Sequence, residues 1–406
     1  MSDRPLRILV ISDGFSKPAY KPRLRSLCEW LHQQGYCIYV VCEKADELSF
    51  AHDYPIDEIA LYRGGMADWT IKNVGTMLFN WKERAFQHEI EKRIAGKKYD
   101  LIFCTSFHTF PLRTANRLGA KLHIPVVLDI RDMMEQAPAN RFLYLSHHTS
   151  WLRPFAELYL VQNIRRRNKE LARATAVTTV SPWHRDVICK LTGQTHVTTI
   201  YNGYDASYFK PQDTPSDHFS IIYTGKVFPS PQQEPSLLFS ALKQLNIPSD
   251  QLSVDWYIDT TSEALIRKLA KEANVEQWMR YHGLVPQSDI VSRLQEASVC
   301  LVLTSHANDT NGHGKMTTKF FEALGVEKPV LCVESDEECL AEVIRDTHAG
   351  LSATNVQEVV DFLHDKYIEW QEKGYTRQKV NLQKKKLFSR QAQALQWEQS
   401  FREITE

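Results

Sequence analysis

The stretch Gly312–Val333, GHGKMTTKFFEALGVEKPVLCV, joins a glycine-containing loop, a short helix and an apolar strand with no spacer between them. Gly312 and Gly314 carry no Cβ, so the loop backbone is free to approach a ligand closely. Thr317 or Thr318 is a suitable N-cap for the helix that follows. Backbone N–H groups at this helix start are therefore predicted to face an anion.

Charged side chains around this helix follow a pattern that suits a nucleotide. Lys315 and Lys319 place positive charge at its start, and Glu322 lies one turn after Lys319 on the same face. Cations at a helix N-terminus suit a diphosphate, and a carboxylate one turn further suits the hydroxyls of a ribose. The alternative is an ordinary loop with Gly325 as the C-cap and Glu322 in solvent, because an isolated glycine-rich loop is a weak signal.

The composition is that of a globular protein with two or three domains. The chain has 406 residues, and its 49 Lys+Arg balance 49 Asp+Glu, so no net positive charge is present to attract nucleic acid. No apolar run approaches the roughly 20 residues of a membrane-spanning helix, and Ile8–Ile11 is too short for a signal peptide. We therefore expect a cytoplasmic protein. Its eight cysteines form no CxxC pair and are predicted to be reduced core thiols.

Short apolar runs alternate with amphipathic stretches along the whole chain. The first set is Leu6–Ile11, Cys37–Val41, Asp100–Cys104, Val126–Ile130, Ala176–Val180 and Val197–Tyr201. The second set is Ser220–Gly225, Ser253–Ile258, Met279–Gly283, Val299–Leu303, Pro329–Val333 and Ala349–Leu351. Strands that alternate with helices predict an α/β fold with two tandem, doubly wound, Rossmann-like domains.

The domain boundaries follow from the segments between these sets. Asp205–Phe219 contains two prolines and no periodicity, which indicates a linker. We place the N-terminal domain at residues 1–212 and the C-terminal domain at residues 213–385. A helix is predicted over Val356–Lys373, and residues 386–406 contain a closing helix, Ser389–Thr405, that is expected to return to the N-terminal domain.

Candidate site residues follow the predicted strands, because ligands of open parallel sheets bind beyond the carboxyl ends of the strands. In the first domain these residues are Asp13, Gly14, Arg23, His108, Arg131 and Asp132. In the second domain they are Gly225, Lys226, Gly283, Leu284 and Val285. Structural alternatives exist for them: the loop after the first strand can be a capping turn with surface cations, His108 can be a satisfied structural histidine, and Arg131 and Asp132 can form a salt bridge.

One segment of the first domain mixes aromatic and basic residues. Phe142–Arg173 reads FLYLSHHTSWLRPFAELYLVQNIRRRNKELAR. This composition fits an amphipathic surface that contacts a membrane. The alternative is a helix that packs on the first sheet and ends in a cluster of cations.

Several motifs together resemble a known family. They are LDIRD at 128–132, VTTVSPWHRDV at 177–187, TTIYNGYD at 198–205, IIYTGKVFPSP at 221–231, YHGLVPQSDI at 281–290 and TTKFFEALGVEKPVL at 317–331. In this order they resemble the GT-B glycosyltransferases of the large retaining family 4 type. The resemblance covers nearly the whole chain and implies two Rossmann-like domains that face a cleft.

The resemblance implies a nucleotide-sugar donor in the second domain and an acceptor in the first. Glu322 would bind the ribose hydroxyls, and Lys226 and Lys319 the diphosphate. Further donor contacts would come from Gly225, Lys315, Thr317, Thr318 and the strand end Gly283–Val285, which would hold the base. His108 would act with the two lysines in catalysis, and Asp13, Gly14, Arg23, Arg131 and Asp132 would contact the acceptor. No metal or other cofactor is expected, and the sequence contains no Asp-x-Asp.

The expected activity is that of a retaining hexosyltransferase. It would move a sugar from a nucleotide sugar, a UDP-sugar above all, to a saccharide or lipid-linked acceptor in cell-surface polysaccharide biosynthesis. Two departures leave alternatives open: Gly314 stands where many members have a glutamate, and Pro231, Gln232 and Gln233 stand where many have a second cation. The alternatives are a catalytically weak nucleotide-sugar-binding subunit and a GT-B sugar-nucleotide epimerase or hydrolase. A peripheral location at the inner face of the membrane is also open.

Overall fold

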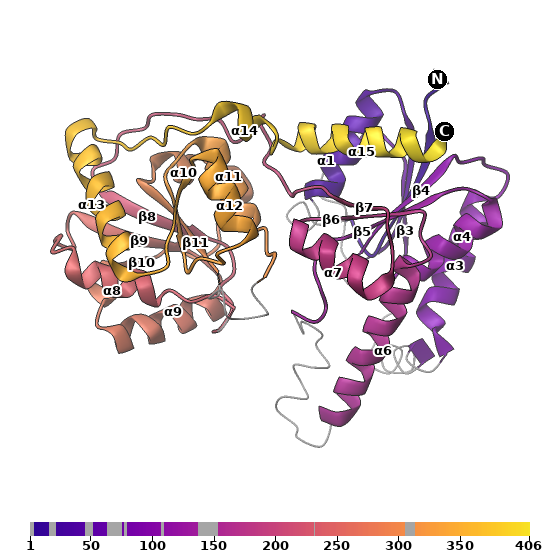
Figure 1. Ribbon diagram of the computed structural model, residues 1–406, viewed down its shortest axis with the longest axis horizontal. Helices are drawn as coiled ribbons and strands as arrows, with labels where there is room; N and C mark the ends of the chain where they lie inside the picture. Colours follow the sequence, from indigo (N-terminus) through magenta and orange to yellow (C-terminus); the bar gives the residue numbers. More distant parts are fainter. Residues whose placement is uncertain are drawn as a thin grey trace. The chain divides into compact units, whose positions relative to one another are not determined.

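The computed structural model describes residues 4–15, 22–44, 52–62, 75–76, 79–106, 109–136, 153–230, 232–304 and 313–406. The chain divides into two compact units (Figure 1). Unit 1 comprises Met1–Tyr201 and Gln393–Glu406, and unit 2 comprises Asn202–Ala392. The sequence placed the boundaries at 212 and 385, whereas the structure assigns the whole of the expected linker and the start of the closing helix to unit 2.

Unit 1 is built on a parallel sheet of seven strands in the order β3-β2-β1-β4-β5-β6-β7. The strands are β1 (Arg7–Ser12), β2 (Cys37–Glu43), β3 (Ile56–Ile59), β4 (Leu101–Ser106), β5 (Val126–Ile130), β6 (Ala176–Thr179) and β7 (Val197–Thr199). The helices are α1 (Pro22–Gln33), α3 (Trp81–Ile94), α4 (Leu112–Leu122), α6 (Arg153–Leu171), α7 (Pro182–Thr192) and α15 (Arg390–Thr405).

Both faces of this sheet are apolar because successive strand side chains point to opposite sides. Leu9 and Ile11 of β1 pack in one core with residues of α3, α4 and α7. Ile8 and Val10 pack in the other core with residues of α1 and α15. The last helix of the chain therefore covers the first sheet, and α15 lies beside α1 (Figure 1).

Unit 2 is built on a parallel sheet of six strands in the order β10-β9-β8-β11-β12-β13. The strands are β8 (Phe219–Thr224), β9 (Leu252–Tyr257), β10 (Met279–Tyr281), β11 (Val299–Leu303), β12 (Val330–Val333) and β13 (Gly350–Ser352). The helices are α8 (Ser236–Gln244), α9 (Thr260–Ala273), α10 (Gln287–Glu296), α11 (Thr318–Val326), α12 (Cys339–Thr347), α13 (Val356–Lys373) and α14 (Leu382–Lys386), with a short 3-10 turn, η2 (Glu276–Trp278).

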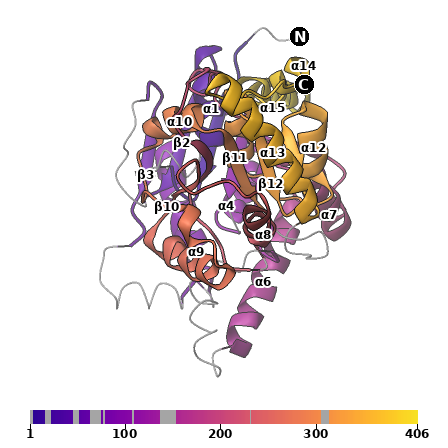
Figure 2. The same cartoon turned by 90° about the vertical axis from the view of Figure 1, so that its left-hand side faces the viewer.

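One face of the second sheet is covered by α8, α9 and α13. Ile221 and Tyr223 of β8 and Trp256 of β9 are completely buried there, together with residues of these three helices. Helices α8 and α13 pack side by side (Figures 1 and 2). Helix α11 packs against β11 and β12.

The structure confirms the expected α/β class and most of the expected elements. The strands Val126–Ile130 and Val299–Leu303 and the helix Val356–Lys373 have the bounds read from the sequence. The sequence missed β3, because IDEI is a four-residue edge strand with two acidic side chains and no apolar run. All eight cysteines are free thiols, as expected, and six of them are buried.

The alternative interpretation of the sequence, in which Gly325 is the C-cap of α11, is wrong. Gly325 is inside the helix, which continues to Val326, and Glu327 is the C-cap with a φ of 57°. A Cβ on Gly325 would lie 2.7 Å from the Cβ of Phe209 and 2.9 Å from Cδ2 of Tyr204. The glycine is therefore needed for a close approach between α11 and residues 204–209.

Within the described ranges, no helix is both long and apolar enough to cross a membrane.

Candidate functional site

The strand order of unit 2 indicates where a ligand binds. β8 and β11 are neighbours in the sheet, and the chain turns away from them in opposite directions. Open parallel sheets bind ligands at such a switch point, beyond the carboxyl ends of the strands. The loop after β8 carries Gly225 and Lys226, and the segment after β11 leads into α11. The two stretches that the sequence assigned to the diphosphate thus start at the same point of the sheet.

The structure brings Gly225 and Lys319 together. Gly225 has a φ of 93°, and a Cβ on it would lie 3.3 Å from Cε and 3.5 Å from Nζ of Lys319. The ammonium of Lys319 also lies 5.1 Å from the ring centroid of Tyr223 on β8. A side chain at position 225 would crowd the lysine, so glycine leaves the cation seated directly over the loop backbone.

The N-terminal end of α11 has backbone donors that no capping side chain uses among the described residues. Thr317 is the N-cap, as expected, but its side chain makes no capping hydrogen bond. The segment before it is held in place, because Asn202 Nδ2 donates to the carbonyl of Met316 at 2.7 Å. His313 Nδ1 lies 2.7 Å from a carboxylate oxygen of Glu338. The N–H groups of this first turn are thus presented on a braced segment, where an anion is favoured.

Glu322 is the carboxylate of this site. It is partly buried, and in the described part of the chain no hydrogen bond or ion pair uses its oxygens. Burial raises the pKa of Glu322, whereas the positive charges of Arg390 and Lys319 act to lower it. Arg390 is the first residue of α15, and its side chain is 10% exposed. The sequence did not predict a role for Arg390, because three helices separate it from Glu322 along the chain and it belongs to no recognisable motif.

Lys226 lies in the segment that follows β8, and Lys315 in the segment that precedes α11. Lys226 is exposed, with its ammonium 5.4 Å from the ring centroid of Phe228. Its charge also helps to lower the pKa of Asp259, after the hydrogen bonds that Asp259 accepts from Ser262. Lys315 is partly buried and immediately precedes the α11 segment.

The position expected to carry a second cation braces the loop instead. Gln233 Oε1 accepts a hydrogen bond from the backbone N–H of Phe228 at 2.8 Å and lies 3.3 Å from the hydroxyl of Tyr223. Gly314, which replaces the glutamate of many family members, is buried with a φ of 69°. Neither position supplies a charge to this site.

The strand end Gly283–Val285 lies at the β10 edge of the same sheet. Gly283 has a φ of 71°, and Leu284 is 67% exposed. Next to it, the rings of Tyr257 and His282 stack with centroids 4.5 Å apart. His282 Nε2 lies 2.6 Å from Asp255 Oδ1, which fixes the imidazole. No local pattern predicts this stack, because Tyr257 is the last residue of β9 and His282 follows β10, 25 positions later.

Among the described residues, no group of three His, Cys, Asp or Glu side chains is arranged to hold a metal ion.

The described acceptor residues expected in unit 1 follow two different strands of its sheet. His108 lies outside the described residues. Asp13 and Gly14 follow β1, where Ser12 Oγ donates to the carbonyl of Gly14 at 2.8 Å. Arg131 and Asp132 follow β5, and Asp132 is exposed. β4 separates β1 from β5 in the sheet.

Arg23 differs from its expected role because it is inside unit 1. Its side chain is 3% exposed, and its NH2 lies 2.8 Å from Oδ1 of Asp129, which is also 3% exposed. Its NH1 donates to the carbonyl of Ile200, and its guanidinium lies 4.2 Å from the ring centroid of Trp397 on α15. Burial lowers the pKa of Arg23 to about 10, although Asp129 acts in the opposite direction. The structure therefore makes Arg23 part of the core.

The described part of the basic-aromatic segment is helix α6. Leu158 is 57% exposed and Val161 is 41% exposed, so this helix has apolar side chains in solvent. Arg167, in contrast, is completely buried and makes two hydrogen bonds to the carboxylate of Glu135, at 2.8 and 2.7 Å. Residues 142–152 lie outside the described residues.

Comparison with known proteins matches residues 23–208 to the family model described as Glycosyltransferase Family 4. No curated protein sequence matches the chain. Among solved structures, sucrose-phosphate synthase from Thermosynechococcus elongatus is similar with a TM-score of 0.69 and 15% identity, over 98% of this chain and 99% of that one. Anabaena HepE in complex with UDP is similar with a TM-score of 0.67 and 15% identity, over 98% and 100%. The lipopolysaccharide outer core galactosyltransferase WaaB, in its apo form, is similar with a TM-score of 0.61 and 12% identity, over 97% and 100%.

Proposed function

We propose that this chain, whose residues 23–208 match the Glycosyltransferase Family 4 model and whose fold is similar to that of sucrose-phosphate synthase and HepE, is a GT-B glycosyltransferase of the family 4 type. It would transfer a hexose from a UDP-sugar, with retention of configuration, to a saccharide or lipid-linked acceptor in cell-surface polysaccharide synthesis. The observation that carries the proposal is the cluster at the switch point of unit 2. Lys319 is seated over Gly225, the first turn of α11 has uncapped donors, and Glu322 has unused oxygens.

Each part of this cluster suits one part of a nucleotide sugar. The ammonium of Lys319 and the N–H groups at the start of α11 would bind the diphosphate, with Lys226 and Lys315 as additional cations. The carboxylate of Glu322 would accept hydrogen bonds from the two ribose hydroxyls. The strand end Gly283–Val285 would hold the base. UDP is favoured because HepE, which has the same fold, was crystallised with UDP and with UDP-glucose.

The chemistry follows from where charge develops. As the sugar–phosphate bond breaks, negative charge grows on the departing diphosphate, and fixed cations stabilise it most in the transition state. We propose that the leaving phosphate itself accepts the proton of the acceptor hydroxyl on the same face of the sugar. This route places no strong protein base at the anomeric carbon, and we expect activity without an added metal ion.

Two finer parts of the proposal concern unit 1. We propose that it binds the acceptor through Asp13, Gly14, Arg131 and Asp132, with His108 orienting the reacting groups. Exposed Leu158 and Val161 on α6 support a peripheral contact with a membrane that carries the lipid-linked acceptor. Binding of the full chain to anionic vesicles, lost in a variant with serine at both positions, tests this contact.

A second candidate function is a catalytically weak nucleotide-sugar-binding subunit. The observation that favours it is that Gly314 and Gln233 contribute no charge where many family members have a glutamate and a cation. This candidate predicts binding of UDP-sugars without their turnover.

The test measures binding and turnover separately. Isothermal titration with UDP, UDP-glucose and GDP is followed by assays for donor hydrolysis and for sugar transfer to saccharide and lipid-linked acceptors. We expect Lys319→Ala and Glu322→Ala each to weaken UDP binding by about ten- to a hundredfold, since each removes a charged hydrogen bond of about 1.5–3 kcal/mol. Binding with neither hydrolysis nor transfer would favour the weak subunit, and binding of no nucleotide would refute both candidates.

A further inference from the structure

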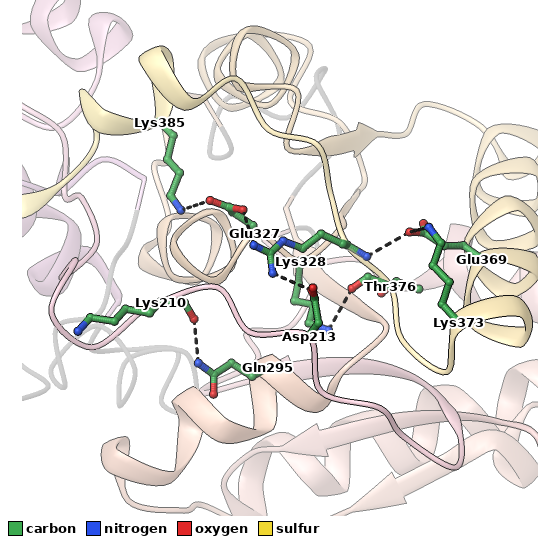
Figure 3. A network of polar contacts seen from close by, with 10 residues as sticks. Lys210, Asp213, Gln295, Glu327, Lys328, Glu369, Lys373, Thr376 and Lys385 are labelled. Atoms are coloured by element: carbon green, nitrogen blue, oxygen red, sulfur yellow. Dashed lines mark hydrogen bonds and ion pairs between the residues drawn. The ribbon is translucent and has the colours of Figure 1, made fainter.

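A buried cation lies at the C-terminal end of α11. Lys385 of α14 is 7% exposed, and its ammonium donates to the carbonyl of Gly325 at 2.8 Å. The same ammonium lies 2.7 Å from Oε1 of Glu327, the C-cap of α11 (Figure 3). The last carbonyls of a helix have no donor within the helix, and the C-terminal end of the helix dipole favours a positive charge. Lys385 supplies both a donor and a positive charge at this end.

The residues that follow α11 are held by two further segments. Arg377 donates through NH2 to Oε2 of Glu327 at 3.0 Å and through NH1 to Oδ1 of Asp213 at 2.8 Å. Lys328 is 1% exposed and donates to the carbonyl of Thr376 at 3.1 Å (Figure 3). Both carboxylate oxygens of Glu327 are thus used, one by Lys385 and one by Arg377.

Apolar contacts fix the same helix from the side. Tyr204 packs where a side chain at Gly325 would be, and its ring centroid lies 5.5 Å from the ammonium of Lys385. The ring of Phe321 lies 5.7 Å from that of Phe388, centroid to centroid. Helix α11 is therefore seated on the chain segments at both ends of unit 2, around residue 204 and around residues 385–388.

We propose that Lys385 is a positioning residue for the nucleotide sugar: it holds the C-terminal end of α11 and thereby places Lys319 and Glu322 for donor binding. The inference rests on the proposed function, because those two side chains are the ones assigned to the donor. Lys319 lies about 9 Å along the helix from Gly325, at 1.5 Å per residue. A helix this short moves as one body, so a shift at its anchored end displaces the binding groups at its other end.

Stability and binding have to be measured apart in a Lys385 variant. Removing one partner of a buried ion pair is destabilising because the other charge stays buried, although Glu327 keeps its second cation, Arg377, when Lys385 is replaced. Lys385→Met keeps the length and apolar stem of the side chain but removes the donor to Gly325 and Glu327. We therefore expect a loss of stability as well as of ligand affinity, and unfolding without ligand measures the first separately from the second.

The experiment compares four forms of the full chain: wild type, Lys385→Met, Lys385→Arg and Lys386→Met. Lys386 is the neighbouring exposed lysine of α14 and serves as the matched control. UDP and UDP-glucose are titrated calorimetrically well below the unfolding temperature, and unfolding is measured without ligand. We expect Lys385→Met to raise the Kd for UDP about tenfold and the donor KM with it, at unchanged acceptor KM. Lys385→Arg should recover part of the affinity, and Lys386→Met should bind like the wild type.

Different outcomes overturn different statements. A lower unfolding temperature for Lys385→Met with a Kd within twofold of the wild type would leave Lys385 purely structural and refute the inference. An equal loss of affinity in Lys386→Met would refute it as well. Absence of nucleotide binding by the wild type would instead refute the proposed function on which the inference rests. If Lys385→Met does not fold, Lys385→Gln, which keeps one donor, takes its place in the same comparison.

Discussion

The buried pair of Arg23 and Asp129 allows a quantitative prediction. Both side chains are 3% exposed, and Asp129 also accepts hydrogen bonds from Thr105 at 3.0 Å and Thr178 at 2.7 Å. Removing one partner of a buried ion pair costs about 3–5 kcal/mol, because the other charge stays buried without compensation. Arg23→Met leaves Asp129 with its two threonine donors, so we expect a loss of about 3 kcal/mol, at the low end of this range.

Asp129→Leu is expected to cost more than Arg23→Met. Among the described residues, the arginine would keep the carbonyl of Ile200 and the ring of Trp397 and no carboxylate, so the loss should be about 5 kcal/mol, at the high end of the range. The double variant should be more stable than the sum of the single effects predicts, because no charge remains buried. Arg25→Met is the control: Arg25 is on the same helix, but its pair with Glu29 is 32% and 37% exposed and is worth at most about 1 kcal/mol.

The assay is chemical denaturation of the full chain, with near-ultraviolet circular dichroism to follow the transition of unit 1. Acceptor kinetics of Arg23→Lys, which keeps the charge, give an independent readout. Stability of Arg23→Met within 1 kcal/mol of the wild type, together with a raised acceptor KM, would refute the buried-pair argument. Such a result would instead support the acceptor-binding role that the sequence predicted for Arg23.

Two further predictions test local geometry. Gly225→Ala should weaken UDP binding by up to about ten- to a hundredfold, because its methyl group would displace Lys319, whose charged hydrogen bond is worth about 1.5–3 kcal/mol; calorimetric titration checks this, and unchanged affinity would contradict the placement of Lys319. Burial raises the pKa of Glu83 from its ordinary value of 4.5 to about 7, against the hydrogen bonds from Thr114. The folded state then binds more protons than the unfolded state between these values, so the free energy of unfolding should fall by at most about 3 kcal/mol as pH rises from 4.5 to 7. Glu83→Gln should remove most of that slope in denaturation curves, and an unchanged slope would assign it to other groups.

Local sequence patterns were sufficient for most of the fold. The apolar runs at Val126–Ile130 and Val299–Leu303 are buried strands. A run of this kind predicts a strand without any information about the rest of the chain. The edge strand β3 was missed because half of IDEI is acidic, and an edge strand needs little burial. The domain boundaries differed because a linker can be recognised by its composition, whereas the unit on which it packs cannot.

For the candidate site, too, some features followed from local sequence patterns and others depended on long-range packing. Lys319 and Glu322 were predicted to act together because a separation of three residues in a helix places two side chains on one face, and that relation is contained in the sequence. Arg390 was missed, and Arg23 was placed in the wrong environment, because a side chain's neighbours depend on which distant segments fold against it. Arg23 and Asp129 are 106 positions apart, and only the packing of α1 on the first sheet brings them together.

By itself, therefore, the sequence determined the two α/β units, most of their strands, and the helix that starts with Thr318 and carries Lys319 and Glu322. Periodicity and spacing are patterns over a few residues, and the prediction of these features requires no information from more distant parts of the chain. Only the tertiary structure decided that Lys385 and Glu327, 58 positions apart, meet at the end of that helix. The physical reason is that burial and long-range hydrogen bonds exist only after distant segments have packed, and they are what holds α11, with Lys319 and Glu322, in place.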